Sequence, residues 1–454
     1  MNVEPKGLAL DERMKYVCSI AVIILAALTA GLSFAKDEPS PPKYAIKAGK
    51  ILTMTPGREF VVGKGVINNG IILLSGGKIE ALGPASSINI PEGYIVIDAS
   101  DRWVTPGIVE AHTHVGAEGG FNDMVTTINP ELKIADSVDP EDISVKKGVT
   151  GGVTTLNAMP GSGTNLAGFS VIIKLDPSDP EKMIFREYGA MKMTQAFNPE
   201  RRAGDLGATR MGMSWILRQI LKQAKEYTET WRAYERGERK EKPGYKLELE
   251  KMRKAFNGEI PTIVHTYSGW GVMQSIRMFN DENNLKVIPT HTAYGGYIVG
   301  DEAAKRAGVF INIGPRVIEF SRPTYDGRFH GMGAEYKKAG VKELSINTDA
   351  VGWDSYIAPQ EELSFQASMS AHFGLDDRDA LKGITINSAR ALGIDDRVGS
   401  LEVGKDADIA IKKGSLLDHT APVDMVLING KIIYQRKGID LVGKQKTAPR
   451  EKES

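Results

Sequence analysis

Short apolar runs alternate with longer amphipathic segments through the middle of the chain. Eight apolar runs have the length and composition of buried strands: residues 107–111, 148–156, 169–175, 190–196, 262–266, 286–290, 309–313 and 343–347. Helical patterns follow most of them, at residues 211–236, 271–279, 301–307, 360–374 and 378–392. Repeated strand–helix units of this number predict an α/β fold, a (β/α)8 TIM-like barrel over residues 104–395.

Both ends of the chain have a different pattern, of short strands separated by turns. Strand patterns precede the barrel at residues 45–54, 70–74, 78–82 and 94–97, and follow it at 404–411 and 423–434. Asn429-Gly430 is a typical hairpin turn within the last of these. Neither end has enough strands to be stable alone. We therefore expect residues 44–103 and 396–440 to pair into one small composite β domain.

The first 35 residues contain a basic residue, Lys15, and then an apolar stretch that ends in small residues at Ser33 and Ala35. This pattern predicts a signal peptide over residues 1–35, a Pro-rich linker at 36–43, and an exported protein, periplasmic or extracellular. The alternative is a membrane anchor, because the stretch approaches the ~20 residues that a span needs. The single cysteine, Cys18, lies inside this segment, so a cleaved chain has no thiol chemistry.

Composition limits the classes of partner. The chain has 454 residues with 57 basic and 57 acidic side chains, which gives no electrostatic reason to expect nucleic acid. We expect a small molecule or a short peptide as partner, and a membrane only if the N-terminal segment stays uncleaved. A charge run at residues 232–242 fits the solvated end of a helix, a lid or a contact in a homo-oligomer. Residues 441–454 form a polar tail.

Histidines stand where several predicted strands end. The first barrel strand ends in His112-Thr113-His114, and side chains two apart on a strand point the same way, so both imidazoles can reach one metal ion. His265, His291 and Asp349 end three further strands. One such histidine is explained by ordinary core packing. Four of the seven histidines at equivalent barrel positions, together with an aspartate, predict a metal site.

These motifs resemble those of the amidohydrolase superfamily, in particular its imidazolonepropionase-like and Xaa-Pro dipeptidase-like branch. The resemblance covers roughly residues 44–438, and its marks are residues 105–114, His265, His291, Thr348-Asp349, residues 387–393 and residues 399–410. It implies a metal-dependent hydrolase on a (β/α)8 barrel, with a composite β-sandwich built from both chain ends. By this resemblance His112, His114 and Asp349 bind a first divalent ion, and His265 and His291 a second, with zinc as the expected metal.

Many members bridge the two ions with a carboxylated lysine, and Lys192 on the fourth predicted strand is the candidate here. A charged lysine is costly to bury among apolar residues, and carboxylation with metal binding removes that cost. The alternative is that Lys192 pairs with a carboxylate such as Glu187. In that case the site holds one ion.

The expected chemistry is hydrolysis of a C–N bond in an amide, cyclic amide or small peptide by metal-activated hydroxide. Asp349 is expected to take the proton of the water and deliver it to the leaving nitrogen. A deaminase or an ester or lactone hydrolase is the alternative on the same site. A non-catalytic relative of the barrel is a third possibility, although such a protein is expected to have lost ligands.

Four further residues are candidates for substrate contact. Tyr267 and Tyr294 follow His265 and His291 on loops, and either contact substrate or pack the barrel rim. Arg316 follows the seventh predicted strand and either binds a substrate carboxylate or forms a structural salt bridge. His330 lies in a glycine-rich loop, as a catalytic or a rim residue.

Overall fold

The computed structural model describes residues 42–57, 61–117, 119–178, 180–201, 206–320, 326–352 and 359–443. The chain divides into two compact units, residues 1–40 and 41–454, and the described residues belong to the second. The expected signal peptide, most of the linker and most of the polar tail lie outside the described residues. Within the described ranges, no helix has the length and apolar character needed to cross a membrane.

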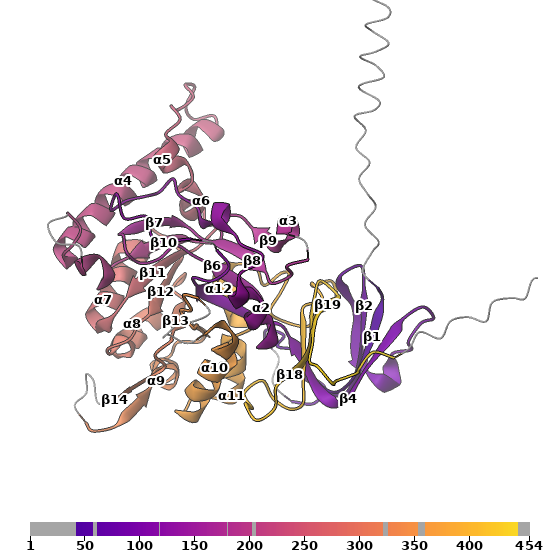
Figure 1. Ribbon diagram of the computed structural model, residues 1–454. Helices are drawn as coiled ribbons and strands as arrows, with labels where there is room; N and C mark the ends of the chain where they lie inside the picture. Colours follow the sequence, from indigo (N-terminus) through magenta and orange to yellow (C-terminus); the bar gives the residue numbers. More distant parts are fainter. Residues whose placement is uncertain are drawn as a thin grey trace, which may run out of the picture. The chain divides into compact units, whose positions relative to one another are not determined.

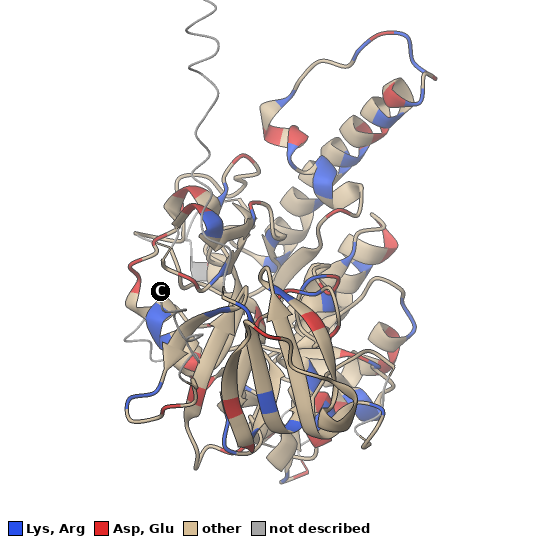
Figure 2. Ribbon diagram, turned by 90° about the vertical axis from the view of Figure 1, so that its right-hand side faces the viewer, with Lys and Arg blue, Asp and Glu red and all other residues tan. Residues whose placement is uncertain are grey.

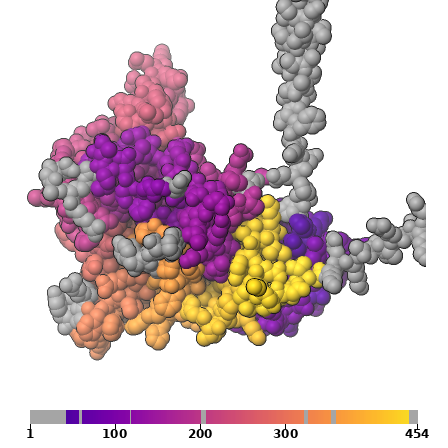
Figure 3. Space-filling view, viewed as in Figure 1, coloured from indigo at the N-terminus to yellow at the C-terminus, as the bar shows by residue number. Residues whose placement is uncertain are grey.

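One seven-stranded sheet joins the two ends of the chain, with the order β19-β18-β17-β4-β1-β2-β3. Its strands are β1 (Tyr44–Leu52), β2 (Val66–Ser75), β3 (Lys78–Pro84), β4 (Ile95–Pro106), β17 (Ile409–Lys412), β18 (Val423–Ile428) and β19 (Lys431–Gln435). Strand β4 is the junction, because it pairs parallel with β1 and antiparallel with β17. Figure 3 shows the result, with the C-terminal residues in yellow beside the N-terminal residues in indigo. The second layer of a sandwich stays a prediction.

Strand β4 is much longer than the expected strand at residues 94–97. It runs on to Pro106 and leads through Gly107 directly into β5 (Ile108–Thr113). A side chain at position 107 would collide with Thr154, so glycine allows this close approach to β6. The seven-stranded sheet is therefore continuous in sequence with the strand that carries the two histidines.

The central strands form two sheets (Figure 1). One has the order β5-β6-β8-β9, and the other β16-β13-β12-β11-β10-β7. Their strands are β6 (Val153–Ala158), β7 (Leu166–Phe169), β8 (Val171–Lys174), β9 (Ile184–Arg186), β10 (Met191–Thr194), β11 (Thr262–Thr266), β12 (Val287–His291), β13 (Ile311–Ile313) and β16 (Leu344–Ile346). β5 and β6 are parallel, as are β10, β11, β12, β13 and β16 in succession. The fold is thus mixed α/β, and closure of the two sheets into a barrel stays a prediction.

Two of the expected strands were wrong in detail. The run at residues 169–175 belongs to two strands, β7 and β8, which pair antiparallel with β10 and β6. An apolar run indicates burial but not strand direction, so its pattern could not reveal this reversal. The run at residues 148–156 begins inside helix α2 (Ile143–Thr150), and β6 starts only at Val153. Gly152, with φ of +93°, makes the turn between them.

Helices follow most of the parallel strands. The longest is α4 (Arg210–Glu235), as expected, and Thr209 caps it by accepting a hydrogen bond from the backbone N–H of Gly212. The others are α3 (Pro180–Met183), α5 (Leu247–Glu250), α6 (Arg253–Phe256), α7 (Ser268–Ser275), α8 (Gly300–Ala304), α9 (Met332–Lys338), α10 (Leu363–His372), α11 (Asp377–Gly383) and α12 (Ile386–Leu392). α7 continues as a π-helical segment, η4 (Ile276–Asp281). A hairpin of β14 (Ile318–Phe320) and β15 (Phe329–Gly331) precedes α9.

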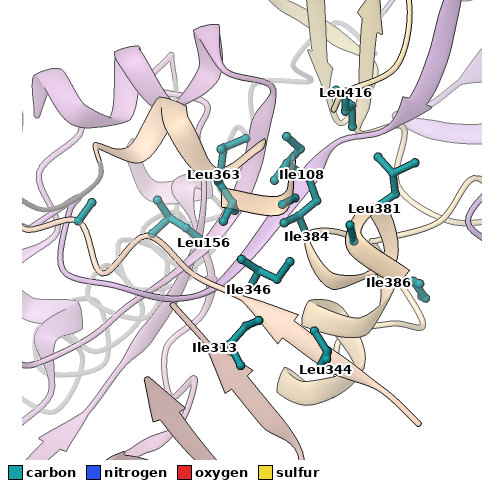
Figure 4. Close-up of a cluster of buried hydrophobic side chains, with 14 of the residues drawn as sticks. Ile108, Leu156, Ile313, Leu344, Ile346, Leu363, Leu381, Ile384, Ile386 and Leu416 are labelled. Carbon is teal, nitrogen blue, oxygen red and sulfur yellow. The ribbon is translucent and has the colours of Figure 1, made fainter. Parts of the chain in front are cut away.

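A hydrophobic cluster packs the last helices against the strands that end in metal-ligand candidates (Figure 4). Ile108 of β5 and Ile346 of β16 are buried in it together with Leu363 and Ile384. Complete burial of one such side chain stabilises the fold by roughly 1.5–3 kcal/mol. The cluster therefore holds the strand that precedes His112 close to the strand that precedes Asp349.

A buried ion cluster connects β8 to the seven-stranded sheet. The ammonium group of Lys174 donates to Asp406 at 2.6 Å, to Asp408 at 3.1 Å and to the side-chain oxygen of Asn429 at 2.6 Å. Elsewhere acidic and basic residues are interspersed along the ribbon, as Figure 2 shows. The chain-end sheet and the central strands are thus tied together by paired charges as well as by apolar packing.

Candidate metal centre

His112 and His114 project side by side from the end of β5, with ring centroids 5.2 Å apart. Both are buried. The Nδ1 of His114 lies 2.8 Å from the backbone carbonyl of Met159 and must donate to it, because a carbonyl only accepts. The neutral ring therefore carries its lone pair on Nε2, and Phe121 stacks on the ring at 4.8 Å. This is the arrangement in which a histidine is ready to bind a metal.

Asp349 approaches these imidazoles from the turn that follows β16. Its Oδ1 lies 3.4 Å from His112 Nδ1, 3.3 Å from His114 Nε2 and 3.9 Å from His291 Nε2. The candidate ligand atoms of His112, His114 and Asp349 all lie within 4.8 Å of one another. Asp349 has φ of +53°, a left-handed conformation that costs a non-glycine residue about 1–2 kcal/mol. Contacts with the surrounding structure must therefore stabilise the left-handed backbone conformation of Asp349.

His265 and His291 end the neighbouring parallel strands β11 and β12. Their ring centroids are 4.6 Å apart, and those of His291 and His112 are 4.9 Å apart. His291 Nδ1 donates to the carbonyl of Gly314 at 2.8 Å, and His265 Nδ1 lies 2.9 Å from the hydroxyl of Ser162. The structure thus brings all four predicted histidines, which are buried, together with Asp349, which is partly exposed.

Lys192 lies on β10 and is fully buried beside this group. Its Nζ is 2.9 Å from His112 Nε2 and 3.4 Å from the sulfur of Met159. Burial lowers the pKa of Lys192 to about 7. Glu187 pairs instead with Lys133, so the expected alternative of a Lys192–Glu187 pair is wrong. Burial thus favours the uncharged amine, which is the form that carboxylation requires.

The donor set fits a divalent ion. His112 Nδ1 and His291 Nε2 are buried and have no hydrogen-bond partner among the described residues. Burial lowers the pKa of both imidazoles, so they are neutral and able to bind a metal. Burial opposes ionisation of Asp349, but its interactions with His291 and His114 outweigh this, and its pKa lies below the usual range. Neutral imidazoles around an ionised carboxylate are a suitable cation site.

Sequence reasoning missed Glu110, which lies two residues before His112. It is fully buried, and burial raises its pKa to about 8. Its carboxylate accepts hydrogen bonds from Thr348 and Gln360. The signal in the sequence was a single acidic residue inside an otherwise apolar strand. Ser162, whose hydroxyl lies 2.9 Å from His265 Nδ1, was missed as well.

Two of the four candidate substrate residues lie close to one another at the ligand group. The ring of Tyr267 stacks on His291 at 5.6 Å, and Tyr294 lies 5.6 Å from Tyr267. Tyr294 is 43% exposed. The guanidinium of Arg316 lies 5.6 Å from the ring of Tyr294. These contacts place Tyr267 against the metal-ligand candidates, with Tyr294 and then Arg316 further out.

His330 has contacts of another kind. Its Nδ1 lies 3.0 Å from Glu335 and its Nε2 3.0 Å from Asp326, while its ring stacks on Tyr297 at 5.7 Å. The hydrogen bonds with Glu335 and Asp326 raise the pKa of His330. None of these partners is a metal-ligand candidate, and the contacts join His330 of β15 to Glu335 of α9 and to Asp326 before β15.

Known proteins resemble this chain in sequence and in structure. The profile of the amidohydrolase family matches residues 333–433. Amidohydrolase tasK of Hapsidospora irregularis is 25% identical over 405 residues, which are 81% of this chain but only 39% of that protein. The imidazolonepropionase of Rhizobium rhizogenes is 25% identical over 395 residues, covering 77% of this chain and 88% of the enzyme.

A solved amidohydrolase from Thermotoga maritima MSB8 superimposes with a TM-score of 0.74 and 26% identity. The superposition covers 87% of this chain and 100% of that protein. The structural similarity thus extends far beyond the residues that the family profile matches. Sequence and structure together support the placement of the chain in the amidohydrolase superfamily.

Proposed function

We propose that this protein is a metal-dependent hydrolase that cleaves a C–N bond in an amide, a cyclic amide or a small peptide. One observation carries the proposal: Oδ1 of Asp349 lies within 3.9 Å of nitrogen atoms from His112, His114 and His291, which come from two different strands. The similarity to an imidazolonepropionase and to other amidohydrolases supports the same reaction class.

His112, His114 and Asp349 would hold the first divalent ion, and His265 and His291 a second. Mixed imidazole and carboxylate ligands suit zinc. The number of ions in the site would depend on Lys192, because its carboxylated form would offer oxygen atoms to both ions. A divalent ion supplies Lewis acidity, which makes a water molecule more acidic and a carbonyl group more electrophilic.

Asp349 is the residue that moves the proton. It is ionised at neutral pH, and its side chain is 17% exposed, more than the side chains of His112, His114 and His291. Its carboxylate can therefore accept a proton from the attacking water and return it to the leaving nitrogen. The ring of Tyr267 stacks on His291 and would shield one side of the reacting bond from water.

The test combines metal analysis with a substrate panel. The purified protein should contain one or two divalent ions per chain, lose activity on chelation and regain it with zinc. The panel should contain dipeptides, N-acyl amino acids, cyclic amides and lactones, with ammonia release measured on aminated heterocycles. Turnover of amides supports the proposal. Turnover of lactones alone would show that the enzyme is an ester hydrolase, and turnover of aminated heterocycles alone that it is a deaminase. A folded protein without stoichiometric metal or turnover is a non-catalytic relative.

A further inference from the structure

Glu110 is a buried acidic residue of β5, two residues before His112. Its Oε1 accepts hydrogen bonds from the backbone N–H of Thr348 at 2.6 Å and from the hydroxyl of Thr348 at 2.8 Å. Its Oε2 accepts from the side-chain amide of Gln360. Three donors thus converge on one carboxylate, and two of them belong to the residue before Asp349.

Thr348 connects Glu110 to the backbone on both sides of Asp349. Its hydroxyl donates to Glu110 and accepts from the backbone N–H of Ala350 at 3.2 Å. The carbonyl of Ala350 in turn accepts from the backbone N–H of His114 at 2.8 Å. The left-handed turn at Asp349 is therefore fixed to β5 at the residue before it and at the residue after it.

Gln360 closes this network on the other side. Its side-chain oxygen accepts from the hydroxyl of Thr113 at 2.8 Å, while its amide nitrogen donates to Glu110. Thr113 stands between the two histidines of β5. The same hydrogen-bond network therefore reaches the histidine pair and the Asp349 turn, which are more than 230 residues apart in sequence.

We propose that Glu110 is a positioning residue, whose carboxylate holds the Thr348-Asp349 turn so that Asp349 meets His112 and His114, and that tight metal binding depends on it. This rests on the proposed function in one respect, that these residues bind a metal. Glu110 faces Thr348 and Gln360 rather than the ligand atoms, so it acts through Asp349.

The choice of a carboxylate has a geometric reason. In this arrangement both oxygens of Glu110 accept, Oε1 from Thr348 and Oε2 from the side-chain amide of Gln360. Glutamine has the same shape but turns one acceptor into an NH₂ group, which would face a donor. Unless Gln360 turns its amide round and reverses its hydrogen bond with Thr113, either the Thr348 contacts or the Gln360 contact must then break.

Zinc affinity of the purified protein, measured by competition with a chromophoric chelator, tests this role. E110Q and T348V should weaken zinc binding by ~10–100-fold, as changes to groups that orient metal ligands do. T348S keeps the hydroxyl and should restore affinity to within a few fold of the wild type. T228V is the matched control, because Thr228 is a buried threonine of α4 whose hydroxyl donates to the carbonyl of Ala224 at 2.7 Å.

The melting temperature of the metal-free proteins separates positioning from simple stability. T228V should lower this temperature without changing zinc affinity. If E110Q and T348V bind zinc as tightly as the wild type while folded, or if T348S binds as weakly as T348V, Glu110 does not position Asp349. A wild-type protein that binds no zinc would instead overturn the proposed function itself.

Discussion

Replacement of Asp349 by asparagine separates the two roles proposed for this side chain. Oδ1 is the oxygen that faces His112, His114 and His291, at 3.4, 3.3 and 3.9 Å. Asparagine keeps one oxygen, which can occupy this position, and turns the other into an NH₂ group. An amide cannot carry a proton at neutral pH. The variant should therefore still bind metal, with the loss concentrated in proton transfer.

The expected magnitude follows from that assignment. Loss of a general acid–base group lowers turnover by ~10²–10⁴-fold, which corresponds to roughly 3–5 kcal/mol in the activation barrier. The glutamate–threonine network that holds the turn contacts the backbone on either side of Asp349, so it persists in the variant. D349N should consequently fold with a melting temperature close to that of the wild type.

The assay is kcat on the best substrate of the panel, at saturating zinc, with metal content measured on the same sample. D301N is the matched control, because Asp301 is an exposed residue of α8 that pairs with Lys305. The kcat of this variant should stay unchanged. If D349N with full metal content retains more than about a tenth of the wild-type turnover, the proton-transfer role is refuted. A variant that loses its metal as well would show that the carboxylate charge is essential for binding.

Three further predictions concern other parts of the chain. K192A should hold at most one divalent ion per chain by elemental analysis, and an unchanged content of two would remove Lys192 from the ligand set. The pKa of His330 is raised by Glu335 and Asp326, so its stabilising effect should be complete below pH 6.5 and disappear as the pH rises through the higher folded-state pKa. The melting temperature of the wild type should therefore exceed that of H330Q by more at pH 6 than at pH 8, and an equal difference at both would contradict this. We also expect export, with a mature N-terminus at or near residue 36 on protein sequencing, whereas an intact residue 1 on membrane-bound protein would indicate an anchor.

Local pattern alone predicted much of the secondary structure and the residues around the candidate centre. The period of apolar residues is a property of neighbouring positions, so α4 and the strand that ends at Thr266 could be predicted closely. His112 and His114 were found for the same reason, since alternation along one strand places them side by side. His265, His291 and Asp349 needed one further step, the convergence of parallel strand ends.

Strand pairing was decided only by the tertiary structure. The run at residues 169–175 is apolar whichever way it runs, and its antiparallel pairing depends on backbone hydrogen bonds with β6 and β10. The length of β4 likewise depends on β17, a strand about 300 residues later that pairs with its second half. Such partners are chosen by packing over the whole chain, which a window of neighbouring residues does not contain.

The hydrogen-bond partners around the site could not be predicted from local sequence either. The sequence shows Glu110 as a single acidic residue within an apolar strand. Its partners Thr348 and Gln360, however, lie 238 and 250 residues away. The neighbours of Lys192 were likewise known only from the fold, because the sequence does not show that its amine lies beside His112. Residue types indicate which chemistry is available, whereas hydrogen-bond partners depend on distances that only the folded chain defines.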